Sequence, residues 1–291
     1  VGGETVQVKL ISYMKILRPV QWLKNLMLFF PPFLGGNLLQ DGLFAAGILP
    51  VATFCIASSG TYILNDIADR DHDRKHPVKK FRPLPSGDVT VSRALPLAVV
   101  LIVAAILLAL SISLKFLLFL LAYLFIAGAY SFSLKKYPII DLFCISSGFL
   151  LRLLAGGEAF GVVVSEWLFL SVFLLALFLS TGKRLSEKNS LGDQAGSHRK
   201  SLSGYPDRFL DGVLFMTGSA VLVTYTMYVV SRHKAILLYT VPLCCFGLLR
   251  YIFRVQSGKG GDPTESLTRD LSLLIVGLLW VFMVGWGIYG R

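Results

Sequence analysis

Charged residues are scarce in this 291-residue chain, and their scarcity excludes an ordinary soluble domain. Only 15% of the residues are Asp, Glu, Lys or Arg, whereas 55% are hydrophobic, and the mean hydropathy is +0.68. About a quarter of the residues of a typical soluble domain are charged, and its apolar share is smaller. The composition therefore predicts that the chain lies in a lipid bilayer.

Several common signatures are also missing. The four cysteines lie inside apolar runs without CxxC spacing or a nearby histidine, so we expect reduced, buried thiols: Cys55, Cys144, Cys244 and Cys245. The chain has no glycine-rich nucleotide-binding string and no linker or low-complexity tract. Its first fifteen residues do not read as a cleavable signal peptide. We therefore expect one transmembrane catalytic domain over residues 1–291.

Long apolar stretches are abundant, and they predict an all-α membrane protein. Stretches of about 17 to 25 residues are long enough to cross a bilayer as helices. Nine such stretches occur, and they predict a bundle of nine transmembrane helices: 17–36, 43–64, 93–112, 115–133, 138–157, 166–182, 210–231, 235–254 and 270–289.

The net charge of +11 could point to nucleic acid, to anionic lipid headgroups or to a phosphate-bearing substrate. The positions of the charges decide against nucleic acid, because most of the 28 lysines and arginines fall at one edge of the predicted membrane region. The opposite edge receives only four of them: Lys115, Arg232, Lys234 and Arg291. Basic residues favour the cytoplasmic side. We therefore expect a cytoplasmic N-terminus, with the long loops 65–92 and 183–209 cytoplasmic and next to the active site.

An acidic motif occurs where the second predicted helix ends. Asp66, Asp69 and Asp73 are spaced i, i+3 and i+7, which places them on one face of a helix. Three such carboxylates repel one another unless a cation neutralises them, and oxygen ligands suit Mg²⁺. The alternative is a solvated acidic helix end whose charges are balanced by nearby basic residues. We favour a magnesium site, because carboxylates at the edge of a bilayer are costly without a purpose.

Basic residues follow the acidic motif directly. Lys79 and Arg82 lie within reach of a phosphate bound at the aspartates, although basic residues beside a membrane also act as topology signals or contact lipid headgroups. Lys24 and Arg152 lie deeper, inside predicted helices. Each could snorkel to the membrane surface or pair structurally with a neighbouring helix, for example with Asp141. Cations inside a membrane are nonetheless functional by default. We expect Lys24 and Arg152 to bind phosphate.

The string from Asn65 to Asp73 resembles the NDxxDxxxD signature of the UbiA superfamily of intramembrane prenyltransferases. Further strings resemble one branch, the decaprenyl-phosphate phosphoribosyltransferases of actinobacterial cell-wall arabinan synthesis; they include RPVQWLKN from Arg18, HPxKxxRPLPSG from His76, GFLLRLLAGG from Gly148 and DPTE from Asp262. The resemblance implies the nine-helix UbiA fold and Mg²⁺. The remaining candidates for substrate binding lie on or near the strings that match: Asn25, Asn65, Tyr130, Lys135, Asp141, Lys183, Arg184, Glu187 and Arg199.

The sequence departs from the wider superfamily at one motif. Members of the superfamily that use a prenyl pyrophosphate as substrate carry a second aspartate-rich motif at the end of helix six. Here the chain reads Lys183-Arg184-xx-Glu187. Cations in place of carboxylates remove ligands for a second metal cluster and add partners for a phosphate monoester. Asp207 and Asp211 are spaced i, i+4 nearby, but we interpret Asp207 as a helix-start acid.

The resemblance implies transfer of 5-phosphoribose from phosphoribosyl pyrophosphate to a polyprenyl phosphate in the bacterial plasma membrane, at a cytoplasmic active site, for cell-wall arabinan synthesis. Pyrophosphate would be held by Mg²⁺ on the three aspartates and by Lys79 and Arg82. The lipid phosphate would be held by cations such as Lys24, Lys183 and Arg184. One alternative is a prenyltransferase that moves an isoprenoid from its pyrophosphate to an aromatic acceptor. Another is a lipid or solute transporter. The sequence leaves a homo-oligomer open.

Overall fold

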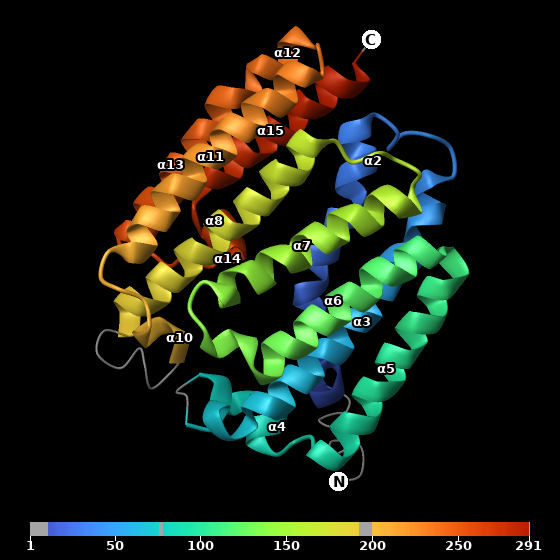
Figure 1. Ribbon diagram of the computed structural model, residues 1–291, viewed down its shortest axis with the longest axis vertical. Helices are drawn as coiled ribbons and strands as arrows, with labels where there is room; N and C mark the ends of the chain where they lie inside the picture. The colour runs from blue at the N-terminus through green and yellow to red at the C-terminus, as the bar shows by residue number, and fades with distance from the viewer. Residues whose placement is uncertain (1–10, 76–77, 192–199, 291) are drawn as a thin grey trace. The chain divides into compact units, whose positions relative to one another are not determined.

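The structure is a computed structural model that describes residues 11–75, 78–191 and 200–290, and within them every regular element is a helix (Figure 1). Eight spans of the described chain are long and apolar enough to cross a membrane. They are α3 (Leu43–Asp73), α5 (Val91–Ile112), α6 (Leu114–Phe132), α7 (Ile140–Ala159), α8 (Glu166–Leu191), α11 (Phe209–Ser231), α12 (Ala235–Leu238) together with α13 (Thr240–Gln256), and α15 (Leu271–Tyr289).

Short helical elements connect or flank these spans. They are η1 (Pro19–Phe29), α2 (Phe30–Gly35), η2 (Lys79–Phe81), α4 (Pro83–Ser86), η3 (Leu134–Lys136), α10 (Lys200–Ser203) and α14 (Pro263–Arg269). The all-helical membrane architecture expected from the sequence is therefore confirmed.

The first expected span, 17–36, has a different structure. It consists of the 3₁₀-helix η1 followed by the short α-helix α2. Pro31 and Pro32 stand at the start of α2 and lack the backbone N–H groups that would continue a hydrogen-bonded helix across the junction. This segment is not among the eight spans, so the count of nine and the cytoplasmic N-terminus stay predictions.

Two helices run further than expected. α3 continues from the predicted end at residue 64 to Asp73, and α8 continues from 182 to Leu191. Hydropathy falls at these points, but Asp, Glu, Lys and Arg are all compatible with a helix, so the backbone hydrogen bonding continues. The first parts of the expected loops 65–92 and 183–209 are therefore helical. The acidic motif and the Lys183-Arg184-xx-Glu187 string therefore stand on the ends of helices.

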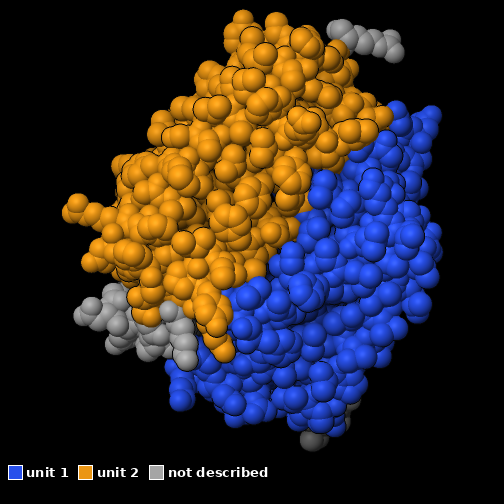
Figure 2. Space-filling model, viewed as in Figure 1, with its two compact units in different colours: residues 1–30, 40–135, 151–162 blue, residues 31–39, 136–150, 163–291 orange. Residues whose placement is uncertain are grey.

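The chain divides into two compact units, blue and orange in Figure 2. Unit 1 comprises residues 1–30, 40–135 and 151–162, and unit 2 comprises residues 31–39, 136–150 and 163–291. Helix α7 contributes its first part to unit 2 and its last part to unit 1. The single domain expected from the sequence stays a prediction.

In unit 1, α3 packs against α5, α6 and η1. Close packing of small residues holds helices together where lipid removes the hydrophobic driving force. A Cβ on Gly60 of α3 would lie 3.2 Å from the Ala98 carbonyl oxygen of α5, so the two backbones approach closely. The buried side chains form two clusters: Leu28, Phe54, Ala57, Ala105, Ala109, Phe116, Leu120, Tyr123 and Ala155, and Ile16, Ile63, Leu84, Val89, Ala94 and Ala98.

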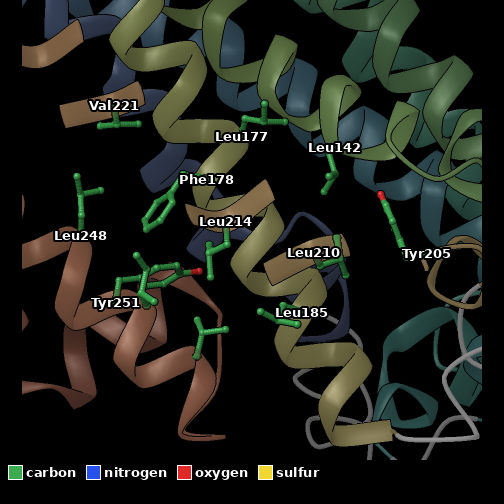
Figure 3. Packing of buried hydrophobic residues seen from close by; sticks show 12 residues of the cluster. Leu142, Leu177, Phe178, Leu185, Tyr205, Leu210, Leu214, Val221, Leu248 and Tyr251 are labelled. Atoms are coloured by element: carbon green, nitrogen blue, oxygen red, sulfur yellow. The ribbon is translucent and has the colours of Figure 1, made fainter. Parts of the chain in front are cut away.

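In unit 2, α8 packs against α11, and α13 packs against α15, α11 and α8 (Figure 1). Figure 3 shows the core between them, in which Phe178 and Tyr251 lie 5.2 Å apart by ring centroids. A Cβ on Gly182 would meet the Tyr251 ring at 2.5 Å, so this glycine lets α13 lie directly against α8. The packing thereby fixes the end of α8 on which Lys183, Arg184 and Glu187 stand.

Candidate active site

The three aspartates of the acidic motif stand on the last turns of α3 in unit 1. Asp66 and Asp73 are almost fully buried, with 3% and 2% of their surface exposed, and Asp69 is half-buried. The side-chain amide of Asn65 donates to Asp69 Oδ2 at 3.2 Å. Buried carboxylates require cationic or hydrogen-bonding partners.

Four cations of unit 1 supply those partners. Arg82 Nη1 lies 2.7 Å from Asp73 Oδ2 and 3.4 Å from Asp66 Oδ1. Arg18 forms a two-point pair with Asp66, with Nε 3.1 Å from Oδ2. Lys135 pairs with Asp69, and Lys79 Nζ lies 3.9 Å from Asp73 Oδ1. Four positive charges therefore face three negative ones, which leaves an excess of positive charge that suits a phosphate.

The aspartates fit a magnesium ion through two of their carboxylates. A single nitrogen of Arg82 contacts both Asp66 and Asp73, so these two carboxylates flank one position of positive charge. Asp69 instead faces Lys135 and Asn65. The described part of the chain holds no group of three His, Cys, Asp or Glu side chains arranged for a metal ion. Mg²⁺ commonly takes one or two carboxylates together with substrate phosphates, so metal binding by all three aspartates stays a prediction.

Arg152 and Asn25 form a second, buried group in unit 1. Arg152 Nε donates to Asn25 Oδ1 at 2.7 Å, and the guanidinium carbon lies 4.5 Å from the centroid of the Tyr123 ring. The Asn25 amide donates to Ser58 Oγ at 3.3 Å. The two predicted residues are thus brought together, and their hydrogen bonds tie η1 to α3 and α7. This geometry favours the structural alternative for Arg152.

Arg184 and Asp141 form a buried ion pair in unit 2. Arg184 Nε lies 2.8 Å from Asp141 Oδ2, and Asp141 is 0% exposed. The Tyr205 hydroxyl donates to Asp141 Oδ1 at 2.6 Å. Burial, together with hydrogen bonding to Asp141, raises the pKa of Tyr205 well above its ordinary value, so the phenol stays protonated and remains a donor. Asp141 therefore anchors Arg184, and its predicted part in substrate binding stays a prediction.

Lys183 stands on the same helix and is more accessible. Its Nζ lies 2.8 Å from Asp262 Oδ2, where 43% of the Lys183 side chain is exposed. Burial raises the pKa of Asp262, but the hydrogen bond and charge of Lys183 and the backbone amides of Glu265 and Thr264 lower it by more, so the net shift is downward. Asp262 is thus an ionised partner of Lys183.

The other predicted residues are less informative. Lys24 on η1 and Tyr130 on α6 are half-buried, and Arg199 lies outside the described residues. Sequence reasoning missed Arg18, Asp262 and Tyr205. Arg18 and Asp262 begin two of the strings that resemble the family, which was a usable signal, whereas nothing in the local sequence marks Tyr205.

Comparisons with known proteins agree with the resemblance drawn from the aspartate string. Residues 28–276 match the model of the UbiA prenyltransferase family. A decaprenyl-phosphate phosphoribosyltransferase of Mycolicibacterium smegmatis is 34% identical, covering 94% of this chain and 92% of the relative. One from Corynebacterium glutamicum is 36% identical, covering 94% and 86%.

A solved structure shows the same fold. It is that of a UbiA homolog from Archaeoglobus fulgidus bound to GPP and Mg²⁺, which superposes with a TM-score of 0.75 and 21% identity over 96% of this chain and 100% of that chain. Together with the family match over most of its length, this similarity means that the chain belongs to the UbiA prenyltransferase family.

Proposed function

We propose that this protein transfers a 5-phosphoribosyl group from phosphoribosyl pyrophosphate to a polyprenyl phosphate and releases pyrophosphate. The observation that carries the proposal is the cluster of Asp66, Asp69 and Asp73 enclosed by an excess of cations in unit 1. The names of the relatives that resemble this chain over nearly its whole length supply the substrate class.

The reaction replaces one bond at the anomeric carbon of the ribose. An oxygen of the acceptor phosphate forms the new bond to this carbon, and the bond to pyrophosphate breaks, so that the electron pair leaves with pyrophosphate. Positive charge develops on the ribose and negative charge on the leaving group. Arg82, Lys79 and Lys135 would stabilise that negative charge, and such stabilisation counts most where the charge develops in the transition state. The acceptor phosphate is already anionic, so no general base is required.

Asp66 and Asp73, with Asp69 beside them, would hold Mg²⁺. When bound, the ion polarises the phosphate oxygens of the donor and neutralises charge on the leaving pyrophosphate. We assign Lys24 of η1 to the acceptor phosphate, because a cation on an apolar segment can meet a lipid headgroup. Arg184, which pairs with Asp141 and Glu187, would support its neighbours, and its expected contact with the acceptor phosphate stays a prediction.

The proposal extends to the place of the reaction. The charge distribution supports a cytoplasmic N-terminus and an active site open to the cytoplasm, where the water-soluble donor is found. The nine apolar stretches of the sequence support nine membrane-crossing segments, and the resemblance to the phosphoribosyltransferase branch supports a bacterial plasma membrane. The product would supply cell-wall arabinan synthesis, as the resemblance to the phosphoribosyltransferase branch implies.

The test uses the purified full chain in detergent with labelled phosphoribosyl pyrophosphate, a polyprenyl phosphate and Mg²⁺. We expect a phosphoribosylated lipid by thin-layer chromatography and mass spectrometry. Asp66→Ala should lower the metal-dependent rate by roughly a hundredfold or more, the usual cost of losing one electrostatic contact to the transition state. The matched control is Asp71→Ala, since Asp71 lies on the same helix end with 78% of its side chain exposed.

A folded Asp66→Ala protein with normal metal-dependent turnover would refute the assignment. The same preparation separates the alternative functions. Consumption of a prenyl pyrophosphate with an aromatic acceptor would identify a conventional prenyltransferase. Uptake of an unchanged solute into proteoliposomes would identify a transporter.

A further inference from the structure

The end of α8 carries a chain of fixed charges in unit 2. Fully buried Asp141 accepts hydrogen bonds from Arg184 at 2.8 Å and from Tyr205 at 2.6 Å. The Tyr205 hydroxyl in turn accepts from the backbone N–H of Ile139 at 2.7 Å. Ile139 has φ +67°, a conformation that a β-branched residue adopts only where its surroundings enforce it. Several segments therefore cooperate to hold Arg184 in one position.

Glu187 is the last residue of this series of paired charges. Arg184 Nη1 donates to Glu187 Oε2 at 2.9 Å, one turn further along α8. Glu187 is 33% exposed, and among the described residues no donor lies within hydrogen-bonding distance of its other oxygen, Oε1. A buried arginine thus orients a carboxylate and leaves one of its oxygens available to accept a hydrogen bond.

A cation lies close to that carboxylate. Lys183 and Glu187 are spaced i, i+4 on α8, so their Cβ atoms are about 5–6 Å apart on one face of the helix. Lys183 is held from the other side by Asp262. A Cβ on Gly261 would lie 2.4 Å from the Gly182 carbonyl oxygen, so the segment that carries Asp262 is packed directly onto α8.

We infer that Lys183 and Glu187 form a subsite for a pentose 5-phosphate, in which Lys183 binds the phosphate and Glu187 Oε1 accepts a hydrogen bond from a ring hydroxyl. The inference rests on the proposed function, and it makes Glu187 the residue of this subsite that recognises a ribosyl group. A polyprenyl phosphate carries no sugar hydroxyl, so a carboxylate beside Lys183 would have nothing to bind on it. Lys183 would therefore bind a sugar phosphate, in place of the lipid phosphate expected from the sequence.

The test measures binding of ribose 5-phosphate, 2-deoxyribose 5-phosphate and 3-deoxyribose 5-phosphate to the full chain in detergent by titration calorimetry. In the wild type, at least one deoxy compound should bind about tenfold more weakly or worse, because hydrogen bonds to charged groups are among the strong ones. Glu187→Gln should reduce that difference to about twofold or less. Lys183→Met should weaken all three compounds by similar factors.

Glu265→Gln is the matched control, since Glu265 is an exposed carboxylate of the same unit that pairs with Arg269 at 3.1 Å, and it should keep the wild-type difference. Equal binding of the three compounds to the wild type would overturn the inference. So would a folded Glu187→Gln protein that keeps the difference, or one in which only the Mg²⁺ dependence of the reaction changes.

The transfer assay separates this inference from the proposed function. If the wild type makes the phosphoribosylated lipid while Glu187→Gln keeps the discrimination, only the subsite is wrong. If the wild type makes no such lipid while Glu187→Gln loses the discrimination, the subsite stands and the proposed function is wrong.

Discussion

Asp141 shows what a single buried charge requires of its neighbours. Its carboxylate is fully enclosed and depends on Arg184 and Tyr205 for its partners. Asp141→Asn removes the fully buried charge that faces Arg184 Nε and leaves Glu187, which is partly exposed, as the remaining carboxylate partner of the guanidinium. Breaking one side of a buried pair costs about 3–5 kcal/mol, so we expect a loss of that size in the free energy of unfolding. Reversible denaturation of the purified protein in mixed micelles would measure it.

Asp207→Asn provides the comparison for that measurement. The substitution is chemically the same and lies in the same unit, but the Asp207 side chain is fully exposed. Its Oδ1 lies 3.4 Å from Lys188 Nζ. Exposed pairs contribute little because water and salt screen them, so this variant should unfold like the wild type. Equal effects of the two substitutions would mean that the Asp141 pair does not stabilise unit 2.

The same residues show how far sequence reasoning reaches. The spacing of Asp66, Asp69 and Asp73 fixed their common helix, and the basic string placed Lys79 and Arg82 beside them. Arg18 and Tyr205 were not foreseen, because their partners lie 48 and 64 positions away in the sequence. Only the tertiary fold brings such groups together, and local spacing carries no sign of it.

At the scale of elements, the close packing of η1 against α7 depends on Gly156. A Cβ at this position of α7 would lie 2.2 Å from the Leu28 carbonyl oxygen, which belongs to the backbone and cannot rotate away. Gly156→Ala therefore forces η1 and α7 apart. We expect a loss of about 1–3 kcal/mol in the free energy of unfolding, the usual cost of overpacking, measured by the same denaturation in micelles.

Gly128 on α6 is the matched control, because nothing lies within 4 Å of the Cβ that alanine would add there. Alanine is the better helix former by about 1 kcal/mol, so Gly128→Ala should leave stability unchanged or raise it. A Gly156→Ala protein as stable as Gly128→Ala would show that η1 does not rest on α7 at this point.

Element boundaries were the weakest part of the sequence prediction. Hydropathy located every apolar stretch, but it responds to side chains, whereas a helix ends where its backbone hydrogen bonds end. The charged turns of α3 and α8 therefore lie beyond the predicted ends, and the prolines of the first stretch divide it into η1 and α2. The misplaced ends matter for function, since the acidic motif and Glu187 both stand on those extra turns.

At the scale of the whole molecule, the distribution of basic residues predicts its orientation. The segment between α3 and α5 carries a run of lysines and arginines. The turn between α11 and α12 carries only two basic residues, Arg232 and Lys234. Basic loops stay in the cytoplasm, so a cysteine introduced by Asp88→Cys should face inward and one introduced by Lys234→Cys outward. Both positions are exposed.

The measurement labels these cysteines with a membrane-impermeant maleimide in a background whose four native cysteines are replaced by serine. Intact cells should label the Lys234→Cys protein alone, permeabilised cells should label both, and detergent-solubilised protein gives the full extent for each. The opposite pattern would place Asp66 and Arg82 on the side that the phosphorylated donor does not reach. Because a sugar pyrophosphate cannot cross the bilayer unaided, the proposed reaction requires the predicted orientation.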